Sequence, residues 1–236
     1  MQTAPVWPLR GLEANLPDQV AALAAAIRGE GSRLATSDTL PGRVALLFVV
    51  RTSRNLDAVA HLSRAGFAAD SVGIVRAILE DTVALAYLAD EPEARAEAWA
   101  TFAEKRAATS VASAGPPDGG AWWSGMGPTK MAKKLRGRHR QIGDELLTVY
   151  WRLCDDTHGS PLSATHYVAP PLEEGRLPQL LAGPSSHRVA ELSALGSICA
   201  TRLCSVAEEL GVLLDLEVII ECATAAMGPY NAGRST

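Results

Sequence analysis

Charged and proton-transferring side chains occur at helical spacing on lines where a helix usually carries apolar residues. In the second predicted helix, Leu47, Val50, Arg54, Asp57 and His61 follow one another at intervals of three and four positions. A helix normally turns such a line toward its packing partner. Because the last three positions are polar, this line predicts an arginine, a carboxylate and an imidazole on the core side of the helix.

Two later helices carry polar groups in the same way. Arg76 and Glu80 are four residues apart and can pair along the third predicted helix. Tyr150, Cys154 and His158 follow the same interval on a long helix, beside apolar positions. A guanidinium with a carboxylate, a phenol and an imidazole can bind an anion and transfer protons.

Burying such groups is costly unless they meet, because an unpaired buried charge destabilises a protein by several kcal/mol. We therefore expect one polar centre, formed by Arg54, Asp57, Arg76, Glu80, Tyr150 and His158. Three interpretations are open: a structural network that sets helix packing, an anion or small-ligand pocket, and a carboxylate-rich metal site. The E-x-x-H signature of di-iron bundles is missing from the sequence, so we predict no metal ligand and no cofactor.

In the pocket interpretation, the catalytic candidates are Glu80, His158 and Tyr150. Arg152 lies about 120° around the helix from His158 and shares the polar face with Asp155. It is still retained among the candidates for ligand binding, which are Arg54, Asp57, Arg76 and Arg152.

The stretch KMAKKLRGRHR, which follows WWSG, contains six Lys or Arg in eleven positions. Basic residues beside aromatic ones can bind nucleic acid through phosphate contacts and stacking. The candidates for this contact are Lys133, Lys134 and Arg138. Met131 and Leu135 give the same segment an apolar stripe, so the alternative is an ordinary solvated helix face.

Several of these motifs together resemble an all-helical bacterial family of unknown function. They are an arginine with polar neighbours on the second helix, R-x3-E followed by YLADEPE, then WWSG, and Y-x3-C-x3-H-G-S. The resemblance covers roughly residues 43–165, and the matching positions are Arg54, Arg76, Glu80, Trp123, Ser124, Gly125, Tyr150 and His158. Cys154 stands where that family usually has serine. The resemblance implies a converging polar centre, and it implies no activity.

A more distant likeness is to the HEPN helical bundles, a superfamily named for higher eukaryotes and prokaryotes nucleotide-binding. Their motif is an arginine followed, after four to six residues, by a histidine, and Arg152 and His158 fit it. Leu153 departs from the polar residue that is usual there. The likeness implies an up-and-down helical core and a metal-independent RNase, in which the histidine transfers a proton and the arginine holds the scissile phosphate.

Helical periodicity predicts the elements that must position these groups. Residues 159–185 contain five prolines and form a long connection. No repeat and no strand-like alternation of useful length is seen, so the predicted fold is a single all-α bundle of seven to eight helices. A terminal arm is predicted at 1–16 and a tail at 228–236. The predicted helices cover residues 17–35, 41–65, 68–90, 92–113, 128–136, 139–157, 186–211 and 214–227.

Composition sets the remaining limits. The chain of 236 residues is 47% hydrophobic and 20% charged, which indicates a folded domain. Its net charge of −4 excludes a protein that binds polyanions through the overall charge of the chain. Four cysteines without a C-x-x-C pair predict reduced, buried thiols instead of zinc ligands. The longest apolar run, VALLFVV, is too short to span a bilayer, and the N-terminus lacks a signal-peptide pattern.

We therefore predict a bacterial, cytoplasmic helical bundle with an anion-accepting pocket and an RNase-like or nucleotide-binding activity. The alternative is a non-enzymatic interaction protein whose buried polar network is structural. The expected partners are RNA or an anionic small molecule, a homodimer is left open, and no membrane association is expected.

Overall fold

The computed structural model describes residues 14–33, 37–112, 124–157, 168–169, 179–180 and 188–227, excluding the side chains of 30–33, 105–112, 155–156, 168–169 and 179–180. The prediction of an all-α bundle is confirmed. The described part of the chain contains eight α-helices, namely α1 (Leu16–Arg33), α2 (Leu40–Arg64), α3 (Val72–Ala89), α4 (Pro92–Ala112), α5 (Pro128–Lys134), α6 (Arg140–Thr157), α8 (Val189–Glu209) and α9 (Leu216–Ala226).

The helix ends follow local capping chemistry, which is why the predicted boundaries agree with the observed ones to within a few residues. At the start of α2, the Thr39 hydroxyl accepts a hydrogen bond of 3.2 Å from the Gly42 backbone N–H. Pro41 lies in the first turn, where its missing N–H has no cost. After α2, Gly66 adopts a φ of 83°, a left-handed conformation that turns the chain toward α3.

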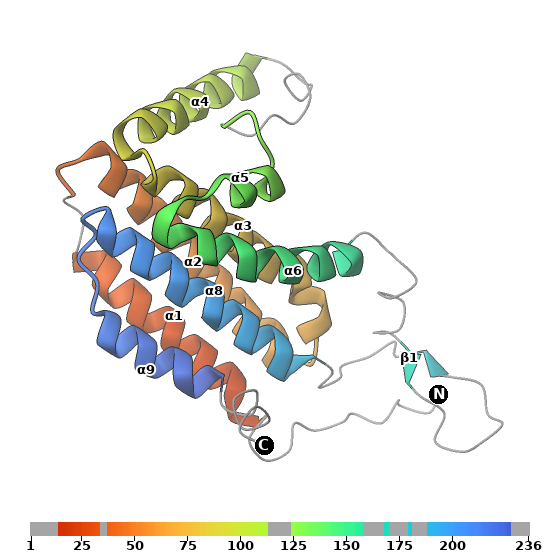
Figure 1. Cartoon of the computed structure of the whole chain (residues 1–236). Coiled ribbons are helices and arrows are strands. Elements are labelled where there is room, and N and C mark those ends of the chain that lie inside the picture. Colours follow the sequence, from red (N-terminus) through yellow and green to blue (C-terminus); the bar gives the residue numbers. More distant parts are fainter. Residues whose placement is uncertain are drawn as a thin grey trace.

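Helix α8 is the central helix of the bundle and packs against α1, α2, α3 and α9 (Figure 1). A Cβ added at Gly196 would lie 3.4 Å from a Leu56 methyl carbon, so α8 and α2 approach closely there. Of the described helices, α8 alone is long and apolar enough to cross a membrane, and 67% of that stretch is buried inside the protein. This burial is typical of a core helix.

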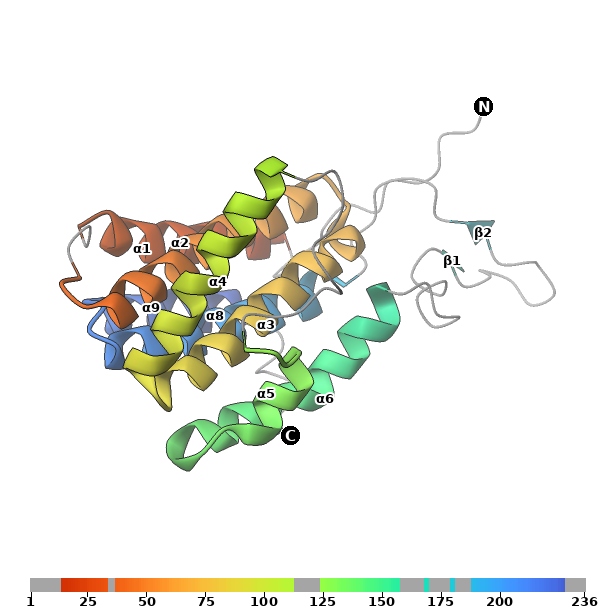
Figure 2. The same cartoon turned by 90° about the horizontal axis from the view of Figure 1, so that it is seen from above.

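The remaining helices lie around this core. Helix α4 packs across α2 and α3, with the rings of Phe48 and Trp99 6.0 Å apart, and α5 and α6 cover α3 from another side (Figure 2). Helices α5 and α6 approach so closely that a Cβ on Gly143 would lie 2.5 Å from the Ala132 carbonyl oxygen. A side chain at position 143 would therefore push the two helices apart.

The expected state of the cysteines is confirmed. All four are free thiols, with Cys154, Cys199 and Cys204 buried and Cys222 half-buried. Burial raises the pKa of Cys199 and of Cys204 to about 12, which keeps both thiols protonated and unreactive.

The expectation about the polar line of α2 is wrong. Leu47, Val50, Arg54 and His61 are exposed, and Asp57 is only half-buried. The buried face of α2 lies elsewhere, because small and hydroxyl-bearing residues serve as its core side. The members of that face are Pro41, Gly42, Val44, Ala45, Phe48, Val49, Thr52, Ser53, Leu56, Val59, Ala60 and Ser63.

Within the predicted connection 159–185, the structure describes one two-residue pairing, in which β1 (Val168–Ala169) runs antiparallel to β2 (Gln179–Leu180). The rest of this connection, and most of the predicted arm and the tail, lie outside the described residues.

Candidate functional site

The pair that the sequence places on the third helix forms as expected. On α3, the Arg76 Nε donates a hydrogen bond of 3.0 Å to Glu80 Oε1. Their side chains are 23% and 16% exposed, so the pair lies at the edge of the bundle where water still has partial access. One turn of helix separates the two residues, which explains why local spacing was enough to predict the contact.

Helix α6 adds two hydroxyl groups to the pair. An Arg76 terminal nitrogen donates a hydrogen bond of 3.0 Å to Thr157 Oγ1, and the other lies 3.5 Å from the Tyr150 hydroxyl. The guanidinium carbon is 5.4 Å from the centre of the Tyr150 ring, which is within cation–π range. We call Arg76, Glu80, Tyr150 and Thr157 the α3–α6 cluster.

The electrostatics of the cluster keep its phenol neutral and its guanidinium charged. Burial raises the pKa of the Tyr150 hydroxyl to about 12, with Cys154 and Glu80 acting in the same direction and Arg76 opposing them. Burial disfavours the charged Arg76, but Glu80, Cys154 and Tyr150 favour it, so the pKa of Arg76 is raised. The cluster therefore offers one permanent positive charge and one phenolic O–H.

Two other predicted members of the centre lie elsewhere. Arg54 is exposed on α2 and forms no ion pair with any residue that the structure describes. Asp57 forms an ion pair with Arg28 of α1, on the outer surface of the bundle. Of the six groups that were predicted to converge, Arg76, Glu80 and Tyr150 therefore meet, whereas Arg54 and Asp57 do not, because the α2 line faces solvent.

The structure describes only one of the two positions of the HEPN-like motif. His158 lies outside the described residues, directly after Thr157 at the end of α6. Arg152 is exposed, and its guanidinium lies 2.8 Å from Glu191 of α8. Arg152 therefore points to α8 and not to the α3–α6 cluster, as the helical-face argument indicated.

The basic segment forms α5 and the turn that follows it. Met131 and Leu135 are buried, so the apolar stripe is confirmed as part of the core. Lys133 and Lys134 are exposed in the last turn of α5. Arg138 is already engaged, with a terminal nitrogen 2.7 Å from Glu209 Oε2.

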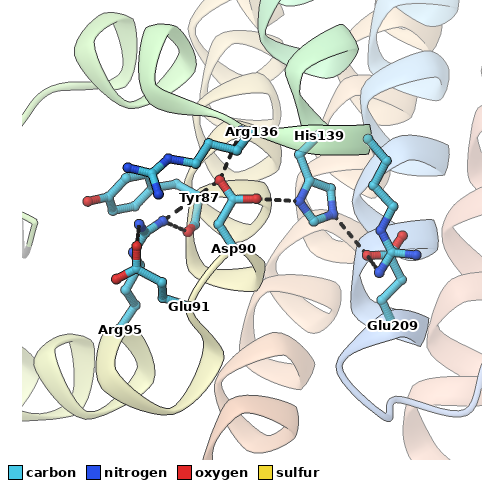
Figure 3. A network of polar contacts seen from close by, with 8 residues as sticks. Tyr87, Asp90, Glu91, Arg95, Arg136, His139 and Glu209 are labelled. Atoms are coloured by element: carbon cyan, nitrogen blue, oxygen red, sulfur yellow. Dashed lines mark hydrogen bonds and ion pairs between the residues drawn. The ribbon is translucent and has the colours of Figure 1, made fainter.

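A second polar network was not predicted from the sequence. His139, whose side chain is only 5% exposed, lies between two carboxylates, with Nδ1 2.8 Å from Asp90 Oδ1 and Nε2 2.9 Å from Glu209 Oε2 (Figure 3). The His139 ring thus connects the end of α3, the start of α6 and the end of α8.

Further contacts hold the Asp90 carboxylate in place. Its other oxygen accepts a hydrogen bond of 3.1 Å from the Arg136 backbone N–H. The Arg95 guanidinium lies 4.0 Å from the same oxygen (Figure 3). It also donates a hydrogen bond to the Tyr87 carbonyl oxygen, and its central carbon lies 3.7 Å from the centre of the Tyr87 ring. In the sequence, His139 stands among the six Lys and Arg residues of the basic stretch, so nothing marked it as the buried one.

Asp81 is a further buried acidic residue that the sequence did not reveal. It lies on α3 next to Glu80, is 4% exposed, and has Arg51 Nε of α2 3.2 Å from its Oδ2. That oxygen receives no hydrogen bond from any described residue. Burial is the main cause that raises the pKa of Asp81 from 3.8 to about 7, with Arg51 opposing and Glu80 reinforcing the rise.

Comparison with known proteins identifies one part of the chain. Residues 42–115 match the model of a family of unknown function, DUF5677. The matched stretch covers most of α2 and all of α3 and α4, so it includes Arg76 and Glu80, whereas Tyr150 and Thr157 lie beyond it. No curated protein and no solved structure matches the chain. The match lends no support to the likeness with HEPN bundles, and what it does identify is a DUF5677 domain, of unknown function, at residues 42–115.

Proposed function

We propose that the α3–α6 cluster is an anion-accepting pocket for a phosphate-bearing ligand, either a nucleotide-like small molecule or RNA. The observation that carries the proposal is the half-buried Arg76 guanidinium, which lies between Glu80 and the hydroxyls of Tyr150 and Thr157. Arginine is well suited to phosphate, because its planar fork can donate two parallel hydrogen bonds.

Each member of the cluster has a distinct role in this proposal. Arg76 supplies the positive charge, and Glu80 holds the guanidinium in one orientation through its Nε. The Tyr150 hydroxyl stays protonated at neutral pH and can donate to a phosphate oxygen. Thr157 instead donates its own hydrogen to backbone carbonyls of α6, including that of Leu153 at 2.9 Å, so it only positions the arginine.

An RNase-like reaction is the enzymatic form of this proposal. Glu80 would act as the proton acceptor and His158 as the proton donor, while Arg76 would stabilise the charge on the phosphate. Arg152 has no role in it, because its guanidinium is paired with Glu191. Lys133 and Lys134, exposed on α5, would add salt-sensitive contacts to an RNA backbone. A cytoplasmic setting is part of the proposal, and it fits the burial of α8, the one described helix that is long and apolar enough to cross a membrane.

A structural role is the second candidate for the same cluster. The observation that favours it is the 3.0 Å ion pair between Arg76 and Glu80, which neutralises the charge that an anion would need. In that role the cluster would fix α6 against α3, and the protein would act through its surfaces. Ligand binding and stability, measured on different variants, distinguish the two candidates.

Arg76→Gln is expected to weaken the binding of a phosphate-bearing probe by about tenfold or more, because a charge-assisted hydrogen bond contributes roughly 1.5–3 kcal/mol. The probes are inorganic phosphate, adenosine monophosphate and a short single-stranded RNA, titrated by calorimetry. Arg152→Gln is the matched control on α6 and should bind as the unmodified protein does. Absence of binding by all three probes would eliminate the pocket, as would equal binding by Arg76→Gln.

Glu80→Ala is expected to lower the free energy of unfolding by about 3 kcal/mol, since it leaves the half-buried Arg76 without its carboxylate. Chemical denaturation measures this loss. The matched control is Glu145→Ala, which removes an exposed ion pair with Arg202 and should cost no more than about 1 kcal/mol. An unchanged midpoint for Glu80→Ala would contradict any orienting role of Glu80, whether for a ligand or for the fold.

A further inference from the structure

An exposed stripe on α2 carries two apolar residues between two arginines. Arg43, Leu47, Val50 and Arg54 follow one another at intervals of four, three and four, which is the spacing of a helix that packs against another helix. Leu47 and Val50 are 55% and 44% exposed, and both arginines are exposed. Within the described part of the chain, neither arginine forms an ion pair. We call these four residues the α2 stripe.

The neighbouring helix α4 exposes a face of the opposite charge. Ala94, Glu97, Ala98, Thr101 and Glu104 are all exposed and lie on one side of α4. The two glutamates form no ion pair with any residue in the described ranges. Ala94 and Ala98 are small, so larger apolar side chains of a partner can approach this side of α4 closely. We call these five residues the α4 stripe.

The two stripes cannot neutralise each other within one chain. Helices α2 and α4 are in contact, but they meet through Phe48 and Trp99, whose rings are 6.0 Å apart. Because the helices use those residues to pack, the arginines and the glutamates remain on outward faces. The two stripes therefore carry opposite charges, and both combine apolar residues with helical spacing. Each still lacks a partner among the described residues.

We propose that a second copy of this chain is that partner, with the α2 stripe of each protomer packed on the α4 stripe of the other. In a twofold dimer both contacts form at once, because each protomer presents both stripes. Leu47 and Val50 lie against Ala94 and Ala98 of the other protomer, and Arg54 faces its Glu97. The α2 stripe does not extend to Asp57, because the Asp57 carboxylate is already paired with Arg28 of α1.

Charge reversal tests the proposal by sedimentation velocity over a concentration series. The unmodified protein should show a reversible dimer, and Arg54→Glu or Glu97→Arg should each weaken it at least about tenfold, since like charges then face each other. Lys134→Glu on α5 and Glu221→Arg on α9 are exposed controls that should dimerise normally. Circular dichroism of each variant confirms that the exposed substitutions leave the fold intact.

Mixing the two variants gives the decisive measurement. An Arg54→Glu chain paired with a Glu97→Arg chain has a favourable pair at both contacts, so the mixture should form a heterodimer although neither variant forms a homodimer. Native mass spectrometry distinguishes the heterodimer by mass. The proposal is overturned if the unmodified protein is monomeric throughout the series, which would indicate a different protein as the partner. It is also overturned if the mixture remains monomeric.

Discussion

His139→Ala is expected to destabilise the protein by about 3–5 kcal/mol, the cost of removing one partner from a buried ionic network. The substitution leaves the carboxylates of Asp90 and Glu209 without the ring that now lies between them at 2.8 and 2.9 Å. Arg138 can still pair with Glu209, but Asp90 is 8% exposed and, among the described residues, has only the Arg95 guanidinium, at 4.0 Å, as a remaining charged partner. The substitution should therefore weaken the packing of α3, α6 and α8 where the three helices meet.

Urea denaturation of His139→Ala beside His61→Ala measures this effect. His61 is exposed, and within the described part of the chain its Nδ1 bonds only to a backbone carbonyl of the same helix, so His61→Ala should cost less than about 1 kcal/mol. A further variant, Asp90→Asn, should lose much of its effect when His139 is already absent, because residues of one network are not additive. Additive losses, or a His139→Ala protein as stable as the His61→Ala control, would contradict the network.

Asp81→Asn is expected to stabilise the protein at neutral and higher pH. Burial raises the pKa of Asp81 from 3.8 to about 7, so the folded protein holds this proton over a range in which the unfolded chain has released it. Between roughly pH 4 and 7, the free energy of unfolding therefore falls as the pH rises, by on the order of 4 kcal/mol in total. Asparagine has no carboxyl proton to lose, so this decrease in the free energy of unfolding is absent from the variant.

The measurement is the difference in unfolding free energy between Asp81→Asn and the unmodified protein, determined from pH 4 to pH 8. The difference should be small at pH 4 and should grow in favour of the variant up to about pH 7, after which it stays constant. Other titrating groups are the same in both proteins and cancel in the difference. Asp70→Asn, the same substitution at an exposed position, is measured beside it for comparison. A pH-independent difference for Asp81→Asn would show that this carboxyl is ionised normally in the fold.

Local contacts were the part of the candidate site that the sequence could predict. Arg76 and Glu80 are one helical turn apart, so their pairing follows from α3 being a helix. Which side of a helix faces the core is harder to predict, and α2 shows why. Its apolar residues lie on both faces, so Leu47 and Val50 suggested a core side that proved to be exposed.

Sequence alone determined which segments are helical, where they end and that they form one all-α bundle, because periodicity, caps and breakers act over a few residues. Only the tertiary structure decided which polar groups meet. His139 lies 49 residues from Asp90 and 70 from Glu209, and no local pattern encodes contacts of that range. Such contacts depend on how whole helices pack, and the burial of a charge such as Asp81 is a property of that packing.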